Sequence, residues 1–483
     1  MSEDIEGADA LDQNGIDRIL DRWPMLPLLS LAFWISWRFI AFSGTMSIGL
    51  GKQDVLFYLT LLMGCIGAVA LPRFTKRTLT IPVTVLGALA SLGTLCLLFA
   101  GPQGPLASSM LIQALSLAGA ALTGLGIGCI AIKSCMLLGR LRPTEIWIWL
   151  AYTEFVVVSI YFVVLGTAGP LASFLFAALP LLAGVTASLG DRAARHWPAR
   201  IEATADEAAV PKSTYLKFAL FVALLSITCY LARLVSTQGI ADPFSTNMLA
   251  WPALGRILLA LAILGGVVFF SRRFPFSRMC VFVMVMILAV LACMSLPGFD
   301  SFWLFTLTAF AHPVLECLTL AIAACLMYRT PERSLFIGAL ALGALYGVVP
   351  IAEGIGWAIE ALAPEALSTV FLIVVVLSAA DALLFLQDKT YDSVMGSVER
   401  PREQVSRGKQ RRLQQALSIK ERMNLSQREY DVLLEIQRGQ SAQKIAEHMN
   451  LSVHTVRGHI QSIYNKCGVH SRDELVDLMS TIE

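Results

Sequence analysis

The sequence predicts an all-α protein in which a polytopic helical membrane domain is followed by a small bundle of four helices at the C-terminal end. Composition is the first observation behind this prediction. Of the 483 residues, 56% are hydrophobic and 15% are charged, and the mean hydropathy is +0.67, whereas about a quarter of the residues of a soluble domain are charged. Distribution is the second observation, because the apolar runs end near residue 387 and the chain that follows is polar.

The membrane domain is expected to contain about twelve spans, because apolar runs of about 20 residues cross the hydrocarbon core. The expected spans lie near 24–44, 54–72, 78–100, 106–133, 144–166, 168–190, 214–236, 247–270, 277–297, 301–327, 334–359 and 364–387. An acidic tail, residues 1–23, precedes them. A polar loop, residues 191–213, divides the spans six plus six into a first half, residues 24–190, and a second half, residues 214–387.

Basic residues in the loops predict the orientation of the chain. They gather in alternate loops, at Arg73, Lys76, Arg77, Arg140, Arg142, Arg192, Arg195, Arg200, Lys212, Arg272, Arg273, Arg278, Arg329 and Arg333. The other loops carry almost none, with Lys52 as the main exception. Since cytoplasmic loops are enriched in Lys and Arg, we expect both termini in the cytoplasm. The acidic N-terminus has no basic region before an apolar core, so no cleaved secretory signal is expected.

The arrangement of six plus six spans around a longer central loop resembles the major facilitator superfamily. PRFTKR (72–77) follows the second span, where that family carries a basic loop motif, and SRRF (271–274) follows the eighth span at the equivalent place. The Gly and Asp positions of the family's motif are absent from both. Basic residues in these loops are also explained by topology alone. The resemblance implies a transporter-like fold and leaves transport activity open.

Ionisable residues lie inside several expected spans, where they are costly to bury and mark a functional cavity or an ion pair. They are Arg38, Glu154, Arg256, His312, Glu316, Glu353 and Asp381. Glu154, Arg256 and Glu316 fall near the middle of their spans. We hypothesise that they line a central pocket between the halves, with Arg38 and His312, and bind a small polar or charged ligand. Buried salt bridges that only fix helix packing explain the same residues equally well, so both interpretations stay open.

Small residues in the spans indicate packing rather than chemistry. The glycines of GLGIG (124–128) and GALYG (343–347) sit inside apolar runs, which favours close helix packing over a phosphate loop.

The ten cysteines form no C-x-x-C pair, so no disulfide framework, zinc site or other metal or cofactor is expected. No Walker, H-E-x-x-H or nucleophile-elbow pattern is present, so we do not expect an enzyme.

Residues 388–423 are predicted to form a basic cytoplasmic linker, helical toward its end. This segment is polar and contains no apolar run long enough to span a membrane. Lys409, Arg411 and Arg412 could contact anionic membrane lipid or DNA phosphate. A purely solvated linker is the alternative, and composition favours it.

Residues 424–483 are predicted to fold into four short helices, because capping residues and helical periodicity recur in them. Ser426 with Glu429 forms a capping box before the first helix. The second helix is expected at Ala442–Met449 with Ser441 as its N-cap, and the third at Val453–Cys467 between Ser452 and Gly468. Another capping box, Ser471 with Glu474, precedes the fourth helix.

The third helix has one apolar and one polar face. Val456, Ile460, Ile463 and Cys467 recur every three or four residues and should pack on the first two helices. The opposite face holds His454, Arg457, Gly458 and Gln461. A helix, a short turn and a second helix with a polar face is the arrangement that reads base edges in the major groove of double-stranded DNA. Arg457 and Gln461 are the expected base readers, and Gly458 would let the helix lie close to the DNA.

This segment resembles the LuxR-type helix-turn-helix domain, also called the GerE or FixJ C-terminal type. The positions that carry the resemblance are Leu425, Arg428, Glu429, Val432, Leu433, Gly439, Ile445, Ala446, Ser452, Thr455, Val456, His459, Ile460, Ile463, Lys466, Gly468, Ser471 and Arg472. Cys467 departs from the family's usual Leu. The resemblance implies that Arg457, Gly458 and Gln461 face bases. It also implies a DNA-binding set of Lys444, Ser452, His454, Thr455, Arg457, Gly458, His459, Gln461 and Lys466, in which Lys444, Thr455, His459 and Lys466 lie toward phosphates.

The charge of this domain limits its expected affinity for DNA. Residues 424–483 contain six Lys and Arg against eight Asp and Glu, a formal net charge of −2, whereas DNA-binding domains are commonly basic. The basic linker, or a homodimer on a palindromic site, would have to supply further affinity.

Together the two parts predict a membrane-bound one-component transcriptional regulator of the bacterial cytoplasmic membrane. The membrane domain would be a sensor for an unknown small ligand or a membrane signal. The alternative is a secondary transporter whose DNA-binding tail regulates it or reports its state.

Overall fold

The structure is a computed structural model that divides into two compact units, residues Met1–Glu399 and Arg400–Glu483. It describes residues 25–42, 53–70, 82–100, 110–167, 169–193, 210–237, 246–270, 301–362, 367–386, 416–437, 440–449 and 451–471, with the single positions 20, 22, 23, 474, 475 and 478. The described residues form helices and no β-strand, so the all-α prediction is confirmed. The first unit is called the membrane unit below and the second the DNA-binding unit.

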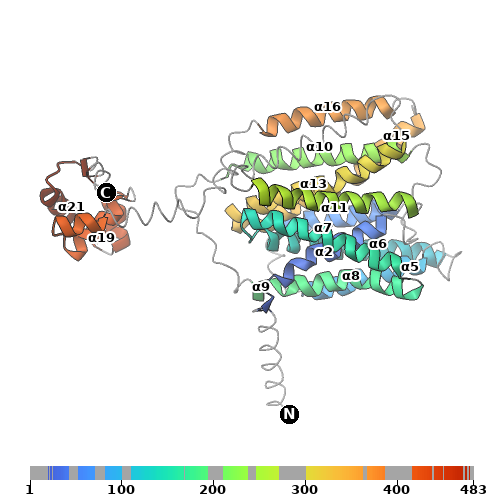
Figure 1. The fold of residues 1–483 in the computed structure, drawn as a ribbon, viewed down its shortest axis with the longest axis horizontal. Coiled ribbons are helices and arrows are strands. Elements are labelled where there is room, and N and C mark those ends of the chain that lie inside the picture. The colour runs from blue at the N-terminus through green and yellow to red at the C-terminus, as the bar shows by residue number, and fades with distance from the viewer. Residues whose placement is uncertain are drawn as a thin grey trace, which may run out of the picture. The chain divides into compact units, whose positions relative to one another are not determined.

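The membrane unit is a bundle of long apolar helices that lie side by side (Figure 1). Its helices are α2 (Leu29–Phe42), α3 (Gln53–Ala70), α5 (Val83–Ala100), α6 (Met110–Leu138), α7 (Pro143–Gly166), α8 (Pro170–Ser188), α9 (Gly190–Ala193), α10 (Lys212–Thr237), α11 (Thr246–Phe270), α13 (Ser301–Arg329), α14 (Ser334–Tyr346), α15 (Val349–Leu362) and α16 (Leu367–Leu386). Short 3₁₀ turns at Leu26–Leu28 and Pro331–Arg333 precede α2 and α14. Helices α2 to α8 belong to the first half and α10 to α16 to the second.

Each expected span that the structure describes overlaps mainly with one of these helices, except that 334–359 overlaps two. Seven described segments are long and apolar enough to cross a membrane, and one of them, Pro331–Ile359, contains α14 and most of α15. Four further apolar segments are shorter: Leu26–Phe42, Leu56–Ile66, Trp251–Val267 and Thr369–Ala382. The expected span 277–297 lies outside the described residues, so twelve spans remain a prediction. Also outside them are most of the tail 1–23, PRFTKR (72–77), residues 194–209 of the central loop, SRRF (271–274), and residues 388–415 of the linker with Lys409, Arg411 and Arg412.

One expected span, 334–359, is divided into α14 and α15, which the sequence analysis did not predict. The division falls at Gly347 and Val348. Pro350 is the second residue of α15, and a proline lacks the N–H that a continuous helix would need at that position. The hydroxyl of Ser226 on α10 donates a hydrogen bond to the carbonyl of Leu345. A side chain of a neighbouring helix therefore donates to a backbone carbonyl beside the break.

Glycines bring α3, α5 and α6 into close contact. A Cβ at Gly124 would lie 1.9 Å from Thr60 Oγ1 and 2.6 Å from the carbonyl oxygen of Phe57 on α3. A Cβ at Gly126 would lie 2.8 Å from the carbonyl oxygen of Leu86 on α5. No side chain fits at these distances, so the prediction that GLGIG serves helix packing is confirmed.

The DNA-binding unit contains α19 (Gln427–Gln437), α20 (Ala442–Met449) and α21 (Val453–Cys467), which pack around a core of their own. Residues 416–422 are also helical, and Ala416 and Ile419 are fully buried in the same core. This end of the expected linker is therefore an integral part of the bundle. Of the expected fourth helix the structure describes positions 474, 475 and 478, and Leu475 is buried in the core.

We predict that Gly124→Ala lowers the thermal stability of the membrane unit, because the added methyl group would overlap Thr60 and the α3 backbone. Overpacking of this kind costs about 1–3 kcal/mol. Thermal unfolding of the detergent-solubilised protein measures the effect. Gly265→Ala on α11 is the matched control, because a Cβ at Gly265 meets no atom within 4 Å. Equal melting temperatures for the two variants would contradict this account of α3–α6 packing.

Candidate nucleic-acid interface and buried charge cluster

The helix that is expected to read DNA is capped at both ends as the sequence predicts. Ser452 has extended backbone angles, and its Oγ accepts a hydrogen bond of 3.0 Å from the Thr455 N–H. Gly468 ends α21 in the left-handed conformation, with φ of 68°, and its N–H donates to the Tyr464 carbonyl. The Oγ of Ser441 likewise accepts from the N–H of Lys444, which caps α20. These caps satisfy backbone groups that a helix leaves unpaired at its ends.

The two faces of α21 separate as the periodicity predicts. Val456, Ile463 and Cys467 are buried against α19 and α20, and Ile460 is half-buried. The other face carries His454, Thr455, Arg457, Gly458 and Gln461, all exposed. α21 is the second helix of the helix-turn-helix. An exposed polar row along the N-terminal half of this helix is the geometry that reading the major groove requires.

Several of the expected DNA-contacting side chains have partners inside the unit. The Gln461 amide donates to Asn465 Oδ1 at 3.2 Å, and the Thr455 and Ser452 hydroxyls lie 2.7 Å apart. His459 is half-buried and Lys444 is exposed. A Cβ built at Gly458 meets no atom of the unit within 4 Å, so the fold itself does not require a glycine there.

Lys466 is held by a buried carboxylate that the sequence analysis assigned only to a helix cap. Its ammonium donates to Glu429 Oε2 at 2.8 Å and to the Asn424 carbonyl at 3.3 Å. The Ser462 hydroxyl donates to Glu429 Oε1 at 2.6 Å, and the Ser426 N–H donates to Glu429 Oε2 at 2.6 Å. Glu429 thus joins the start of α19 to the C-terminal half of α21.

Glu429 titrates far below the usual range of a glutamate. The hydrogen bonds from the Lys466 ammonium and then from the Ser462 hydroxyl lower the pKa of its carboxyl from 4.5 to about 2. The side chain is 5% exposed. The capping-box spacing predicted the Ser426 contact, but the contacts with α21 join residues more than thirty positions apart, which no local pattern reveals.

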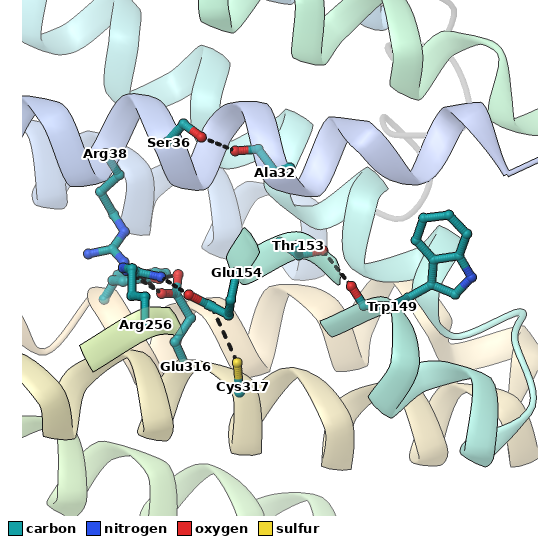
Figure 2. Close-up of polar contacts among 10 residues, drawn as sticks. Ala32, Ser36, Arg38, Trp149, Thr153, Glu154, Arg256, Glu316 and Cys317 are labelled. Carbon is teal, nitrogen blue, oxygen red and sulfur yellow. Dashed lines mark hydrogen bonds and ion pairs between the residues drawn. The ribbon is translucent and has the colours of Figure 1, made fainter. Parts of the chain in front are cut away.

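In the membrane unit, four of the ionisable residues expected in the spans form one buried cluster, shown in Figure 2. Arg38 on α2 pairs with Glu316 on α13 at 2.8 Å, and Arg256 on α11 pairs with Glu154 on α7 at 2.5 Å. A third contact, from Arg256 to Glu316, measures 3.4 Å. The four side chains are at most 8% exposed. The salt bridges that the sequence left as one of two interpretations are therefore present, and ligand binding remains a proposal.

Aromatic side chains that the sequence analysis did not single out surround the cluster. The Tyr346 hydroxyl donates a hydrogen bond to Glu316 Oε1. The Arg38 guanidinium carbon lies 5.0 Å from the ring centroid of Tyr346, and that of Arg256 lies 4.8 Å from the centroid of Phe39. These distances allow cation–π attraction in addition to the ion pairs.

His312 lies beside the cluster and forms no ion pair with another described residue. Its ring stacks on Tyr346 at 6.1 Å and meets Tyr230 edge-on at 5.8 Å. Its Nε2 is buried and has no hydrogen-bond partner among the described residues. Glu353 on α15 and Asp381 on α16 are not members of the ion-paired cluster.

Comparison with protein families identifies the DNA-binding unit. Residues 423–479 match the family described as bacterial regulatory proteins, luxR family. This segment is therefore a LuxR-type helix-turn-helix domain, as the sequence predicted. No curated protein matches the chain.

Comparison with solved structures identifies the fold of the membrane unit. A bacterial homologue of the iron transporter ferroportin, in an outward-facing state with soaked iron, is 15% identical over 76% of this chain and 98% of its own, with a TM-score of 0.52. The major facilitator superfamily transporter FucP in the outward conformation is 14% identical over 75% of this chain and 97% of its own, with a TM-score of 0.49. The membrane unit has a fold like that of the ferroportin homologue, and the likeness concerns the fold alone.

We predict that Glu429→Gln removes part of the acid sensitivity of the DNA-binding unit. A carboxyl whose pKa is lowered by folding stabilises the native state fully above its unfolded pKa of about 4.5, and this contribution is lost as the pH falls toward about 2. Urea unfolding of residues 400–483 between pH 7 and pH 2.5 measures it. Lys466→Met, which removes the first donor, should flatten the profile in the same direction. Parallel profiles for wild type and Glu429→Gln would contradict the assignment.

We predict opposite effects of Gly458→Ala on stability and on DNA binding. Alanine favours a helix over glycine by about 1 kcal/mol, and the site is open, so the free energy of unfolding should rise by up to about that amount. The affinity for DNA should fall, because the methyl group would occupy the surface that is expected to face the bases. Urea unfolding and equilibrium DNA binding test the two effects.

Gly468→Ala is the control for this change. Its φ of 68° is unfavourable for alanine, so this variant should lower the free energy of unfolding by about 1 kcal/mol. A Gly458→Ala variant that binds DNA as tightly as wild type would show that α21 does not approach the DNA at this position.

Proposed function

We propose that the protein is a membrane-bound one-component transcriptional regulator, in which the membrane unit is the sensor and the DNA-binding unit is the output. One observation carries the proposal: a single chain joins a LuxR-type domain with an exposed polar face on α21 to a membrane unit of transporter-like fold. Because both parts belong to one chain, no separate messenger between membrane and DNA is required.

Base readout is assigned to Arg457 and Gln461, with Gly458 allowing a close approach. Arginine bonds guanine through two donors, and glutamine pairs with adenine through its amide. Both side chains are exposed on the same face of α21. Lys444, Ser452, His454, Thr455, His459 and Lys466 are assigned to the surrounding DNA contacts, with the ammonium of Lys466 shared between phosphate and Glu429.

We further propose that the regulator acts as a homodimer on a palindromic site. The net charge of −2 over residues 424–483 gives one domain little electrostatic attraction for DNA. Two domains on paired half-sites, or the basic residues of the linker, supply the remaining affinity. DNA binding requires the C-terminal unit in the cytoplasm, which agrees with the orientation that the basic loops predict for a bacterial cytoplasmic membrane.

The sensing site is assigned to Arg38, Glu154, Arg256, His312 and Glu316. Ionisable groups buried within spans are costly and are kept where a function uses them. Four of these residues meet in one cluster, and next to it lies the Nε2 of His312, which has no hydrogen-bond partner within the described part of the chain. A small ligand that competes for these groups would change how the two halves are held together.

A secondary transporter with a regulatory DNA-binding tail is the second candidate, and the transporter-like fold of the membrane unit favours it. Flux of a substrate in membrane vesicles that is lost in Glu154→Gln would support it. The two functions differ in whether the cluster acts on a transported substrate or on DNA binding.

We predict that residues 388–483, presented with a pool of DNA sequences, select a defined and palindromic site. Arg457→Ala should weaken binding to that site by about 1–3 kcal/mol and relax the preference at one base pair. Lys444→Ala is the matched control, because a lost phosphate contact should weaken binding to all sequences alike and reduce its salt dependence. Binding that is uniform across sequences, and unchanged in Arg457→Ala, would reject DNA readout by α21.

A further inference from the structure

The two shorter buried ion pairs of the membrane unit cross between its two halves. The first half contributes Arg38 and Glu154, and the second contributes Arg256 and Glu316. Arg38 pairs with Glu316 and Arg256 with Glu154, so each half supplies one cation and one anion to partners in the other. The four charges sum to zero.

Other contacts around the cluster cross in the same way. The Arg38 guanidinium lies over the ring of Tyr346 from the second half, and that of Arg256 lies over the ring of Phe39 from the first. The hydroxyls of Tyr58 on α3 and Tyr230 on α10 lie 3.0 Å apart. The two shorter ion pairs of the cluster therefore cross between the halves, whereas the longer contact, from Arg256 to Glu316, lies within the second half.

If the two halves moved apart where the cluster lies, the Arg38–Glu316 and Glu154–Arg256 pairs would separate together. The first half would then keep the Arg38 guanidinium and the Glu154 carboxylate without these partners, and the second half would keep only the longer contact between Arg256 and Glu316, which is strongly unfavourable in a low-dielectric interior. Buried charges of opposite sign at these distances are strongly coupled. The closed arrangement is thus stabilised by charge pairing that an open arrangement lacks.

We infer that the crossed pairs Arg38–Glu316 and Glu154–Arg256 are a latch that holds the two halves closed. Its role in signalling rests on the function proposed above: release of the latch would be the step by which a signal in the membrane changes DNA binding. The latch itself is a property of the membrane unit and can be tested without knowing the signal.

The test replaces one pair by apolar residues of similar size, Arg38→Met with Glu316→Leu. Exchange of a whole buried ion pair for apolar side chains commonly preserves stability, whereas loss of one partner does not. The double variant should therefore remain folded but lack one of the two ion pairs that form the latch. Cys317 is the reporter, because it is 2% exposed and its thiol lies 3.4 Å from Glu154.

Alkylation of Cys317 by N-ethylmaleimide is followed by mass spectrometry in the full-length protein in membranes. We expect the rate in the double variant to exceed that of wild type by about tenfold or more, the factor that corresponds to one strongly coupled charge pair. Cys325 on the same helix is the internal reference, because it is 0% exposed and lies in the packed core. Its rate should not change.

Two further variants control the test. Asp381→Asn neutralises a carboxylate on α16 that is not part of the cluster, and should leave the Cys317 rate at the wild-type value. Tyr346→Phe removes only the hydroxyl that donates to Glu316, and should raise the Cys317 rate by a smaller factor. This milder variant keeps the inference testable if the double variant does not accumulate.

Three results would overturn the latch: wild-type protection of Cys317 in the double variant, equal acceleration at Cys317 and Cys325, or the same acceleration in Asp381→Asn. A transcriptional reporter read in parallel separates the latch from the proposed function. Faster alkylation of Cys317 with an unchanged reporter would support the latch and reject the membrane unit as the sensor.

Discussion

Neutralisation of buried charge is the constraint on which the membrane unit depends. Hydrocarbon offers no water to a guanidinium or a carboxylate, so Arg38, Glu154, Arg256 and Glu316 must find partners within the bundle. The partners come from the opposite half in both of the shorter ion pairs. Neither half is therefore complete by itself, and the same interactions that permit these residues to be buried also determine how the halves face each other.

The DNA-binding unit also contains a buried carboxylate that needs partners from other parts of the fold. Glu429 accepts hydrogen bonds from Ser426, Ser462 and Lys466, as Glu316 does in the membrane unit from Arg38, Arg256 and Tyr346. In each case a buried acid joins helices that are distant in sequence. The consequence differs, because Glu429 fixes α21 with its polar face outward, while Glu316 joins two halves whose separation would remove its shorter ion pair, the one with Arg38.

Local sequence patterns predicted the helices. They could not predict which side chains of different helices form pairs. The capping residues Ser426, Ser452 and Gly468 occupy the helix ends that their spacing predicted. The pairing of Arg38 with Glu316 joins residues 278 positions apart, so the sequence could indicate a buried cluster but not its partners. The break before Pro350 was missed because the surrounding run is continuously apolar, and hydropathy does not register the lost backbone hydrogen bond.

The point at which the linker joins the DNA-binding unit bears on how a signal could act. Ala416 and Ile419 are buried in the same core as Val456 and Ile463 of α21. Lys420 donates a hydrogen bond to Gln427 and lies over the ring of Tyr430, and these contacts tie the same short helix to α19. A displacement of residue 416 would therefore move side chains that are packed in the core of the DNA-binding unit. Because α21 packs in the same core, a movement of the end of the linker would also move α21 and its exposed face.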